Sequence, residues 1–537
     1  MELFYCCCCS LLFALLVHVI LRALARRRQP RPRLPPGPWQ LPIIGSLHHL
    51  LRGGGGLPHR AMADLSLHYG PLMLLRVCER VVVVVSSAEA AGEIYGGGRD
   101  AAFSERPGSP GIDELYRSGQ GIIFAPYGDH WRQLRRILMT ELLSQRRVES
   151  FRRIREEEAS CLVSSLMVHV QHDSSGGGVV NIDQLLGRFM ADSAVRAIFG
   201  DALPDRDAFL RMIKRGTELS SLFDVRDLFP SSRLARLLAS WSGGKAELHR
   251  LDMFRLMDDI LKQHDEKKAA GGGERDDGKQ DMVDVLLRIQ SEGDMRVSLT
   301  HGVIRTFLTV RFSFFFFQVF YGQQNKKYLE VPDVLGAALE TSTTTLQWVM
   351  ADLMANPNVM QKAQAEVRRV FTGQATINEA ALGNLQYLKA VIKETLRLHP
   401  PSPAFPRVCL EEGCKIQGYD IPRGTIVLTN VWAISRDPKY WVEPQKYMPE
   451  RFEDDSAVDF RGMHFEFTPF GVGRRICPGM NFSHVNVEIA LASLLFHFDW
   501  ELPSGVKPDN VDMTELFGVT MRRKTELFIR PIPHVPL

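Results

Sequence analysis

The sequence predicts a mainly α-helical protein with small β-sheets and one N-terminal transmembrane helix. Apolar residues recur at the helical spacing of three to four over 360–371 and 385–398, and a basic amphipathic stretch covers 131–143. Strand-like runs are few and short: 72–76, 81–85 and 425–430. Gly-rich or charged segments separate these stretches as surface loops. One large, mostly helical domain therefore accounts best for the body of the chain.

An almost wholly apolar run at residues 3–21 predicts the transmembrane helix. Only Ser10 and His18 interrupt this run, and at 1.5 Å per residue it spans about 28 Å, close to the thickness of a bilayer core. Arginines follow the run at once, so the rest of the chain is expected in the cytosol. The alternative is a signal peptide cleaved near 23–25. In a signal peptide, however, the basic residues precede the apolar run, whereas here they follow it.

The chain divides into three predicted parts. A membrane anchor covers 1–28, a proline-rich hinge covers 29–45, and the large domain covers 46–537. Prolines fix φ and resist helix formation, so the hinge is expected to be a stiff, extended spacer.

Composition excludes several classes of protein. Among 537 residues, 65 Lys and Arg balance 62 Asp and Glu, and a net charge of +3 gives no support to a nucleic-acid binder. Nine cysteines are too few for a disulfide scaffold, and their spacing matches no zinc site, so a reducing compartment is expected. No Gly-x-Gly-x-x-Gly loop follows a strand, which argues against a nucleotide site within the chain.

The most informative segment is the glycine-punctuated loop 470–479, which carries Cys477 and precedes a predicted helix over 480–496. Glycines allow tight turns and the close approach of a flat ligand. A helix N-terminus, with Arg475 two residues away, favours the thiolate form of such a cysteine. A thiolate held in this way can be the axial ligand of haem iron. The alternative is a buried free cysteine beside a turn.

Five residues of this loop match the haem-binding signature of the cytochrome P450 family: Phe470, Gly473, Arg475, Cys477 and Gly479. Three other segments resemble plant microsomal members, especially the clan that oxidises terpenoids and other specialised metabolites: 103–107, 227–230 and 430–438. The resemblance implies the triangular helical P450 fold and haem b with Cys477 as its axial iron ligand. It also implies electrons from NADPH through NADPH–cytochrome P450 reductase, with cytochrome b5 as a further donor, at the endoplasmic reticulum membrane.

Three charged residues match scaffold positions of the family. Glu394 and Arg397 lie three residues apart on one helix face, where they can pair, and the family motif adds Arg451 from the segment 449–452. The resemblance implies a buried network that holds the cysteine loop. An ordinary surface ion pair is the alternative.

Four residues match positions that bind the haem propionates. Trp131 and Arg135 lie one helical turn apart, so an indole N–H and a guanidinium can donate to the same carboxylate. Arg407 and Arg475 match two further propionate-binding positions of the family. Without the other motifs, a basic solvated helix face would explain Trp131 and Arg135.

The family's oxygen-binding motif is matched by residues 337–341. Glu340 and Thr341 provide the acid and the hydroxyl that could pass protons to bound dioxygen through water. The alternative is a surface Glu beside a Thr that bonds back to its own helix. Ala338 replaces the usual glycine, which adds a methyl group where dioxygen would pack.

The segment 309–332 interrupts the family pattern. Residues 301–308 and 333–341 resemble parts of one long helix, yet four consecutive phenylalanines at 314–317 and the helix-breaking Pro332 lie between them. We interpret 309–332 as an insertion, of the kind that translated intron sequence would give; a genuine loop at the membrane face is the alternative. An exposed run of phenylalanines would also favour aggregation.

The expected substrate is a small lipophilic molecule. Segments that match the family's recognition regions are mainly apolar: 108–124, 219–229, 333–341, 402–405 and 517–518. A terpenoid suits them best, and phenylpropanoid or indole compounds stay open. The function that follows is insertion of one oxygen atom of O2 into this substrate. The alternatives are a non-oxygenating P450 isomerase or dehydratase, and a membrane haem protein impaired by 309–332.

Overall fold

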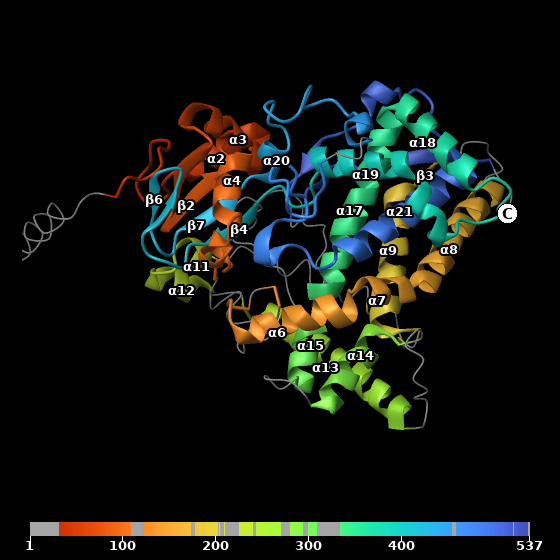
Figure 1. Ribbon diagram of the computed structural model, residues 1–537, viewed down its shortest axis with the longest axis horizontal. Helices are drawn as coiled ribbons and strands as arrows, with labels where there is room; N and C mark the ends of the chain where they lie inside the picture. The colour runs from red at the N-terminus through yellow and green to blue at the C-terminus, as the bar shows by residue number, and fades with distance from the viewer. Residues whose placement is uncertain are drawn as a thin grey trace, which may run out of the picture.

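The computed structural model describes most of the large domain and part of the hinge (Figure 1). The described residues are 32–108, 122–123, 125–172, 178–201, 203, 209, 225–239, 243–269, 280–293, 299–308, 333–453, 458–518 and 520–534. Within these ranges no helix has the length and apolar character needed to cross a membrane. The predicted anchor at 3–21, the segment 309–332 and most of the recognition segment 108–124 lie outside the described residues.

A four-stranded sheet forms the smaller lobe, at the left of Figure 1. Its strands run in the order β1 (Leu72–Val77), β2 (Arg80–Val85), β7 (Ile426–Thr429) and β4 (Phe405–Val408). The outer pairs are antiparallel, whereas β2 and β7 pair in parallel, with Val82 opposite Ile426. The three predicted strand runs are therefore confirmed as members of one sheet, and β4 was not predicted.

Three smaller sheets complete the strand content. They are β3 (Val180–Asn181) with β11 (Phe528–Pro533) and β8 (Phe498–Glu501); β5 (Cys414–Ile416) with β6 (Tyr419–Ile421); and β9 (Glu515–Leu516) with β10 (Arg522–Arg523). All their pairings are antiparallel.

Helices make up the larger lobe and cover the sheet. In chain order they are α2 (Leu47–Arg52), α3 (Pro58–Tyr69), α4 (Ala88–Tyr95), α6 (Asp129–Ile137), α7 (Gln145–Ser150), α8 (Arg152–His172), α9 (Ile182–Phe199), α11 (Val225–Leu228), α12 (Arg233–Ala239), α13 (Gly243–Ala269), α14 (Met282–Glu292), α15 (His301–Leu308), α17 (Asp333–Ala355), α18 (Pro357–Val370), α19 (Gln386–Leu398), α20 (Val431–Ile434) and α21 (Met480–His497). The four predicted helical stretches correspond to α6, α18, α19 and α21. The first of these ends earlier than predicted, because Leu138–Leu142 continues as a wider π-helical turn.

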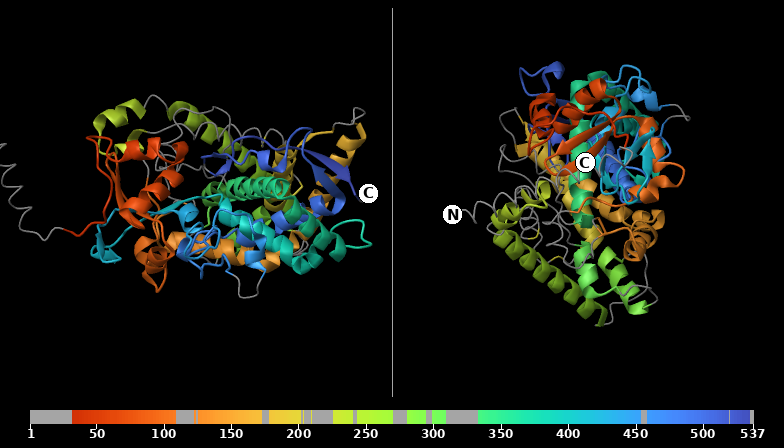
Figure 2. Two further views of the ribbon diagram at one scale, coloured as in Figure 1. Left: turned by 90° about the horizontal axis from the view of Figure 1, so that it is seen from above. Right: turned by 90° about the vertical axis from the view of Figure 1, so that its left-hand side faces the viewer.

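Helix α17 runs through the middle of the helical lobe (Figures 1 and 2). It contacts α9, α19 and α21 along its length, and α15 lies against it as well. Its second half is largely buried, and the side chains of Leu346 and Trp348 there are fully buried. Of the predicted oxygen-binding residues on this helix, Glu340 and Thr341 are partly buried.

The described part of the hinge does not stand clear of the domain. Leu74 N–H donates to the Pro36 carbonyl (2.7 Å), and Ser46 N–H donates to the Arg76 carbonyl (2.5 Å), so the chain runs along β1. A Cβ on Gly37 would lie 1.9 Å from the Leu74 carbonyl oxygen, which only glycine avoids. The described part of the expected spacer is therefore docked against β1 of the domain.

Candidate functional site

The Cys477 loop is a tight backbone turn that ends at the N-terminus of α21. Cys477 N–H donates to the Phe470 carbonyl (2.9 Å), and Ile476 N–H donates to the Gly473 carbonyl (3.0 Å). Gly473 has φ of +70°, a left-handed conformation that side-chain-bearing residues rarely adopt. Gly479 is the residue before α21, and a Cβ there would lie 4.0 Å from the Cys477 sulfur. The loop thus presents the sulfur in one fixed position.

Asp100 fastens this loop to the rest of the molecule. It lies in the short 3-10 helix η2 (Arg99–Phe103), and its carboxylate accepts from the Arg474 backbone N–H (2.9 Å) and from Arg474 Nε (3.1 Å). A Cβ on Gly473 would approach Asp100 Oδ2 to 3.2 Å, so the glycine also makes room for this carboxylate. Sequence reasoning missed Asp100, because 374 residues separate the partners and no local pattern marks it.

Burial raises the pKa of the Cys477 thiol above its usual value, and it outweighs the groups that lower the pKa. Those groups are the Gly479 backbone N–H and the charges of Arg135 and Arg106. The helix end does favour the thiolate, through the Gly479 N–H, but burial outweighs this effect. The nearby positive charge comes from Arg135 and Arg106 rather than from Arg475, which corrects that expectation. A coordinating metal ion deprotonates a thiol outright, so a buried thiol is compatible with an iron ligand.

Three arginines gather around the loop, and we call Arg135, Arg407 and Arg475 the arginine cradle; Arg407 and Arg475 are buried, and Arg135 is half-buried. Burial lowers the pKa of all three, and that of Arg475 falls to about 9, helped by repulsion from Arg407 and Arg135. The hydrogen bonds of these three side chains go to backbone carbonyls, and none of the three forms an ion pair with a carboxylate of the described residues, although Glu105 acts favourably on Arg475. Unpaired buried cations are costly, so the cradle is suited to an anionic ligand.

Backbone carbonyls accept from the cradle to different extents. Arg475 donates to the carbonyls of Ser104 (2.8 Å), Ala125 (2.7 Å), Ile123 (3.2 Å) and Ile122 (3.4 Å), and its guanidinium lies 4.4 Å from the centre of the Trp131 ring. Arg407 donates only to the carbonyl of its neighbour Pro406 (2.9 Å) among the contacts of the described residues. Two carboxylates of a haem would satisfy this set of donors, so the residues present fit that group.

The remaining predicted propionate ligands lie close by. Trp131 is buried, and its indole N–H donates to the Ile122 carbonyl (3.1 Å). Arg135 donates to the Ile476 carbonyl (2.6 Å), next to Cys477 in the chain. The structure therefore brings α6 and the cysteine loop together, and propionate binding by these side chains stays a prediction.

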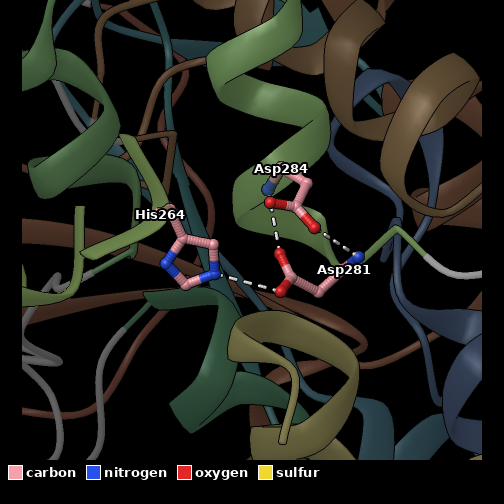
Figure 3. Close-up of side chains that lie close together, drawn as sticks. All are labelled: His264, Asp281 and Asp284. Carbon is pink, nitrogen blue, oxygen red and sulfur yellow. Dashed lines mark hydrogen bonds and ion pairs between the residues drawn. The ribbon is translucent and has the colours of Figure 1, made fainter. Parts of the chain in front are cut away.

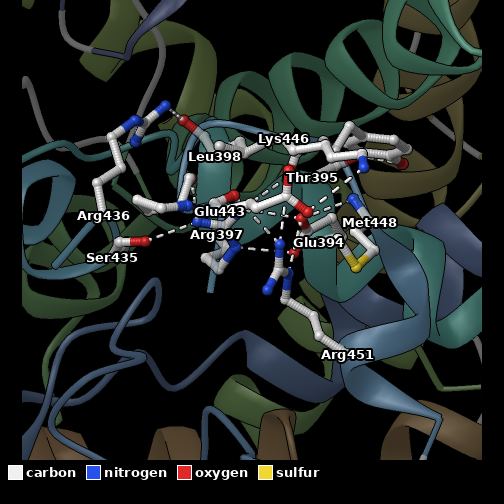
Figure 4. Close-up of polar contacts among 12 residues, drawn as sticks. Glu394, Thr395, Arg397, Leu398, Ser435, Arg436, Glu443, Lys446, Met448 and Arg451 are labelled. Atoms are coloured by element: carbon white, nitrogen blue, oxygen red, sulfur yellow. Dashed lines mark hydrogen bonds and ion pairs between the residues drawn. The ribbon is translucent and has the colours of Figure 1, made fainter. Parts of the chain in front are cut away.

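Glu394, Arg397 and Arg451 form one buried cluster (Figure 4). Arg397 makes two parallel bonds of 2.8 Å to the Glu394 carboxylate, and Arg451 Nε donates to it at 3.1 Å. Both Glu394 and Arg397 side chains are wholly buried. The spare Arg397 donors reach the carbonyls of Ser435 and Pro444, both at 2.8 Å. Every charge here has a partner, which suits the predicted scaffold role.

Glu340 and Thr341 lie side by side on α17. The Glu340 carboxylate accepts a hydrogen bond from Thr520 (2.9 Å), a residue that sequence reasoning missed. Burial raises the pKa of Glu340, against opposing effects of Arg522 and of that hydrogen bond. The side chain of Ala338 lies outside the described residues, so the effect of its methyl group stays a prediction.

One group of potential metal ligands lies elsewhere within the described ranges: His264, Asp281 and Asp284 (Figure 3). His264 bonds to the Ile260 carbonyl (2.8 Å) and to Asp281 Oδ2 (3.0 Å), while Asp281 and Asp284 cap α14 reciprocally. These bonds already explain the cluster as a junction between α13 and α14.

Comparisons with known proteins agree with this site. The family model described as cytochrome P450 matches residues 35–313 and 323–529, and the chain belongs to the cytochrome P450 family. Desmethyl-deoxy-podophyllotoxin synthase of Sinopodophyllum hexandrum is 43% identical over 97% of this chain and 96% of its own. 5-epiaristolochene 1,3-dihydroxylase of Nicotiana tabacum is 40% identical over 96% of each chain. Ent-isokaurene C2/C3-hydroxylase of Oryza sativa subsp. japonica is 42% identical over 98% of this chain and 97% of its own.

A solved structure shares the fold. A zebrafish cytochrome P450 with abiraterone superposes with a TM-score of 0.67 and 23% identity, covering 89% of this chain and 99% of that one. The chain is thus a cytochrome P450 monooxygenase with plant relatives, and its family and fold imply a haem-thiolate cofactor. The family match omits 314–322, inside the segment 309–332; the insertion itself stays a prediction.

Proposed function

We propose that this P450 is an endoplasmic reticulum enzyme that hydroxylates a small terpenoid. Its electrons would come from NADPH through NADPH–cytochrome P450 reductase, with cytochrome b5 as a further donor. The observation that carries the haem chemistry is the arginine cradle, a set of largely buried cations beside the Cys477 loop that has no carboxylate ion pair among the described residues. The substrate class rests on relatives named for 5-epiaristolochene, ent-isokaurene and premnaspirodiene.

Each site residue has a role that follows from its position. Haem, when bound, would supply the iron that activates dioxygen. Cys477 would bind the iron through its sulfur, and the fixed turn around it would limit movement of that sulfur. The arginine cradle would bind the two propionates, together with the Trp131 indole if it exchanges the Ile122 carbonyl for a carboxylate. Carboxylates would thereby replace weak carbonyl contacts of the cradle with charge-assisted bonds.

Glu340 and Thr341 would deliver protons. A carboxyl group whose pKa is raised by burial holds a proton at higher pH than a solvated one, and is therefore a better proton donor near neutrality. Thr341, next on the helix, would orient the water that passes the proton on. Apolar walls at Phe405 and Phe517, both buried, would exclude bulk water.

Turnover with candidate substrates tests the proposal. Microsomes that contain the full chain and a plant P450 reductase would be supplied with a panel of sesquiterpene and diterpene hydrocarbons. The expected result is a product heavier by one oxygen atom, formed only with NADPH and labelled by 18O2. A product that forms without NADPH and O2 would instead identify an isomerase or dehydratase. Products from phenylpropanoids or indoles alone would overturn the terpenoid assignment.

Membrane attachment is tested separately. We expect the full chain to resist extraction by alkaline carbonate, because residues 3–21 would cross the bilayer. A chain that lacks 1–31 should be extracted to a large extent. Equal extraction of both forms would contradict the anchor.

A further inference from the structure

Glu340 is held by a residue that lies 180 positions away in the sequence. Thr520 Oγ1 is 2.9 Å from Glu340 Oε1, and Thr344 Oγ1 is 3.2 Å from Thr520 Oγ1. Both threonines are almost completely buried, each with 2% of its surface exposed. Because the single hydroxyl hydrogen of Thr520 is donated to the carboxylate, Thr344 donates its own to Thr520. The three side chains therefore fix one orientation of the Glu340 carboxyl group.

The backbone around Thr520 is anchored independently of this hydroxyl. The indole N–H of the fully buried Trp348 donates to the Met521 carbonyl (2.8 Å), and Met521 N–H donates to the Pro401 carbonyl (2.8 Å). Removal of the Thr520 hydroxyl would thus leave the loop in place.

Few charged groups compete for Glu340. Arg522, on β10, is the charge that acts on it. Two described residues that meet this part of α17 from neighbouring helices are uncharged: Ser483 of α21 bonds to Ser342, and Gly187 of α9 lies against Thr343. The hydrogen bond from Thr520 is therefore a main determinant of where the carboxyl group points.

We propose that Thr520 is a positioning residue for the monooxygenase reaction, whose hydroxyl aims the Glu340 carboxyl group and couples it to the loop 514–523. The inference rests on the proposed proton-delivery role of Glu340. The same loop carries Phe517 and Gly518, which we expect to line the substrate site, and Phe517 stacks on His59 at a centroid distance of 5.8 Å. Thr520 thus links the substrate wall directly to the proton donor.

Four variants of the full-length holoenzyme test this role. Thr520→Val removes the hydroxyl and keeps the shape, whereas Thr520→Ser keeps the hydroxyl. The infrared C=O band of the protonated Glu340 carboxyl group is identified by its absence from Glu340→Gln. Thr525→Val is the matched control, because Thr525 also donates to a carboxylate, that of Asp512 (2.8 Å), but on the exposed surface. Thermal unfolding and the reduced carbon-monoxide spectrum check that each variant folds and holds haem.

Two readouts are expected to change in Thr520→Val. The pH midpoint of the Glu340 band should rise by about one unit, since a bond to the charged form is lost. The ratio of oxygenated product to hydrogen peroxide should fall on the order of tenfold, because the free energy of one lost hydrogen bond corresponds to a rate change of this size. Thr520→Ser and Thr525→Val should match the unmodified protein. If Thr520→Val does not hold haem, Thr344→Val should show smaller shifts in the same directions.

The outcomes separate this inference from the proton-delivery role. An unchanged band midpoint and an unchanged product ratio in Thr520→Val would overturn the positioning role of Thr520. An unchanged product ratio in Glu340→Gln would overturn proton delivery by Glu340 itself, even if Thr520→Val still shifts the band.

Discussion

Two groups of buried arginines in this P450 differ in one respect: whether the protein supplies their counter-charges. Arg397 and Arg451 share the Glu394 carboxylate, and their other donors reach backbone carbonyls (Figure 4). The arginine cradle has no such carboxylate among the described residues, and its members repel one another. A closed cluster stabilises the fold by itself, whereas an open cluster needs a ligand that brings negative charge.

The difference shows how burial should be interpreted. Both clusters contain fully or nearly fully buried guanidinium groups, so burial alone does not separate scaffold from site. The balance of charge does, because a protein rarely buries a cation without a partner unless a ligand completes the pair. The predictions below test this distinction, in order of decreasing expected effect.

Loss of the Cys477 sulfur should have the largest effect. Cys477→Ala is expected to abolish the thiolate-type spectrum and all monooxygenase activity, because no described cysteine lies in an equivalent position. Absorbance of the reduced carbon-monoxide complex is the measurement, and Cys161→Ala, at an exposed cysteine, is the control. A thiolate-type band that persists in Cys477→Ala would contradict the ligand assignment.

Breaking the closed cluster should lower stability strongly. Glu394→Ala leaves two buried cations without their carboxylate and should cost about 3–5 kcal/mol of unfolding free energy. Glu453→Ala is the matched control: its partner Lys362 is exposed, so the loss should stay below about 1 kcal/mol. Denaturant unfolding measures both. Equal costs would show that the cluster is not a closed scaffold.

A second closed cluster makes the free energy of unfolding depend on pH. His59 (3.2 Å) and Arg60 (2.8 Å) bind Glu515, and despite burial these partners lower its pKa to about 2. Because the folded pKa is below the unfolded value, this stability is present above about pH 4.5 and is lost as pH falls toward 2. It amounts to about 3 kcal/mol, at 1.36 kcal/mol per unit.

Unfolding experiments between pH 5 and 2.5 would measure this loss. In Glu515→Gln the free energy of unfolding should fall less steeply between pH 5 and 2.5. Glu412→Gln, at an exposed site, should leave this pH dependence unchanged. A fall as steep in Glu515→Gln as in the unmodified protein would refute the assignment.

The smallest effect is expected in the open cluster. Arg407→Met removes a cation whose only described hydrogen bond is to Pro406, so the haem-free protein should be as stable as before or slightly more stable. Haem affinity should fall about tenfold, since one charge-assisted contact to a propionate is lost. Haem titration and denaturant unfolding give the two values. Arg423→Met, at an exposed site, is the control. A loss of haem-free stability in Arg407→Met that Arg423→Met does not show would place Arg407 in the scaffold.

Sequence reasoning found the parts of the site that lie in short, continuous motifs. The Cys477 loop, the Glu394–Arg397 pair and the helices α6, α18, α19 and α21 each depend on neighbours close by in the sequence. Asp100 and Thr520 escaped notice, since their partners lie 374 and 180 residues away and only tertiary packing brings them together. The orientation of Arg475 depends on backbone carbonyls, which no side-chain pattern reports.

The reduced carbon-monoxide difference spectrum, recorded with and without residues 310–332, tests the central claim most directly. If the arginine cradle and the Cys477 loop form a haem-thiolate site, the shortened chain will show a thiolate-type Soret band. The same band in the full chain would show that the segment 310–332 is a loop that haem binding tolerates. Absence of the band from both forms, with the protein folded, would contradict the site.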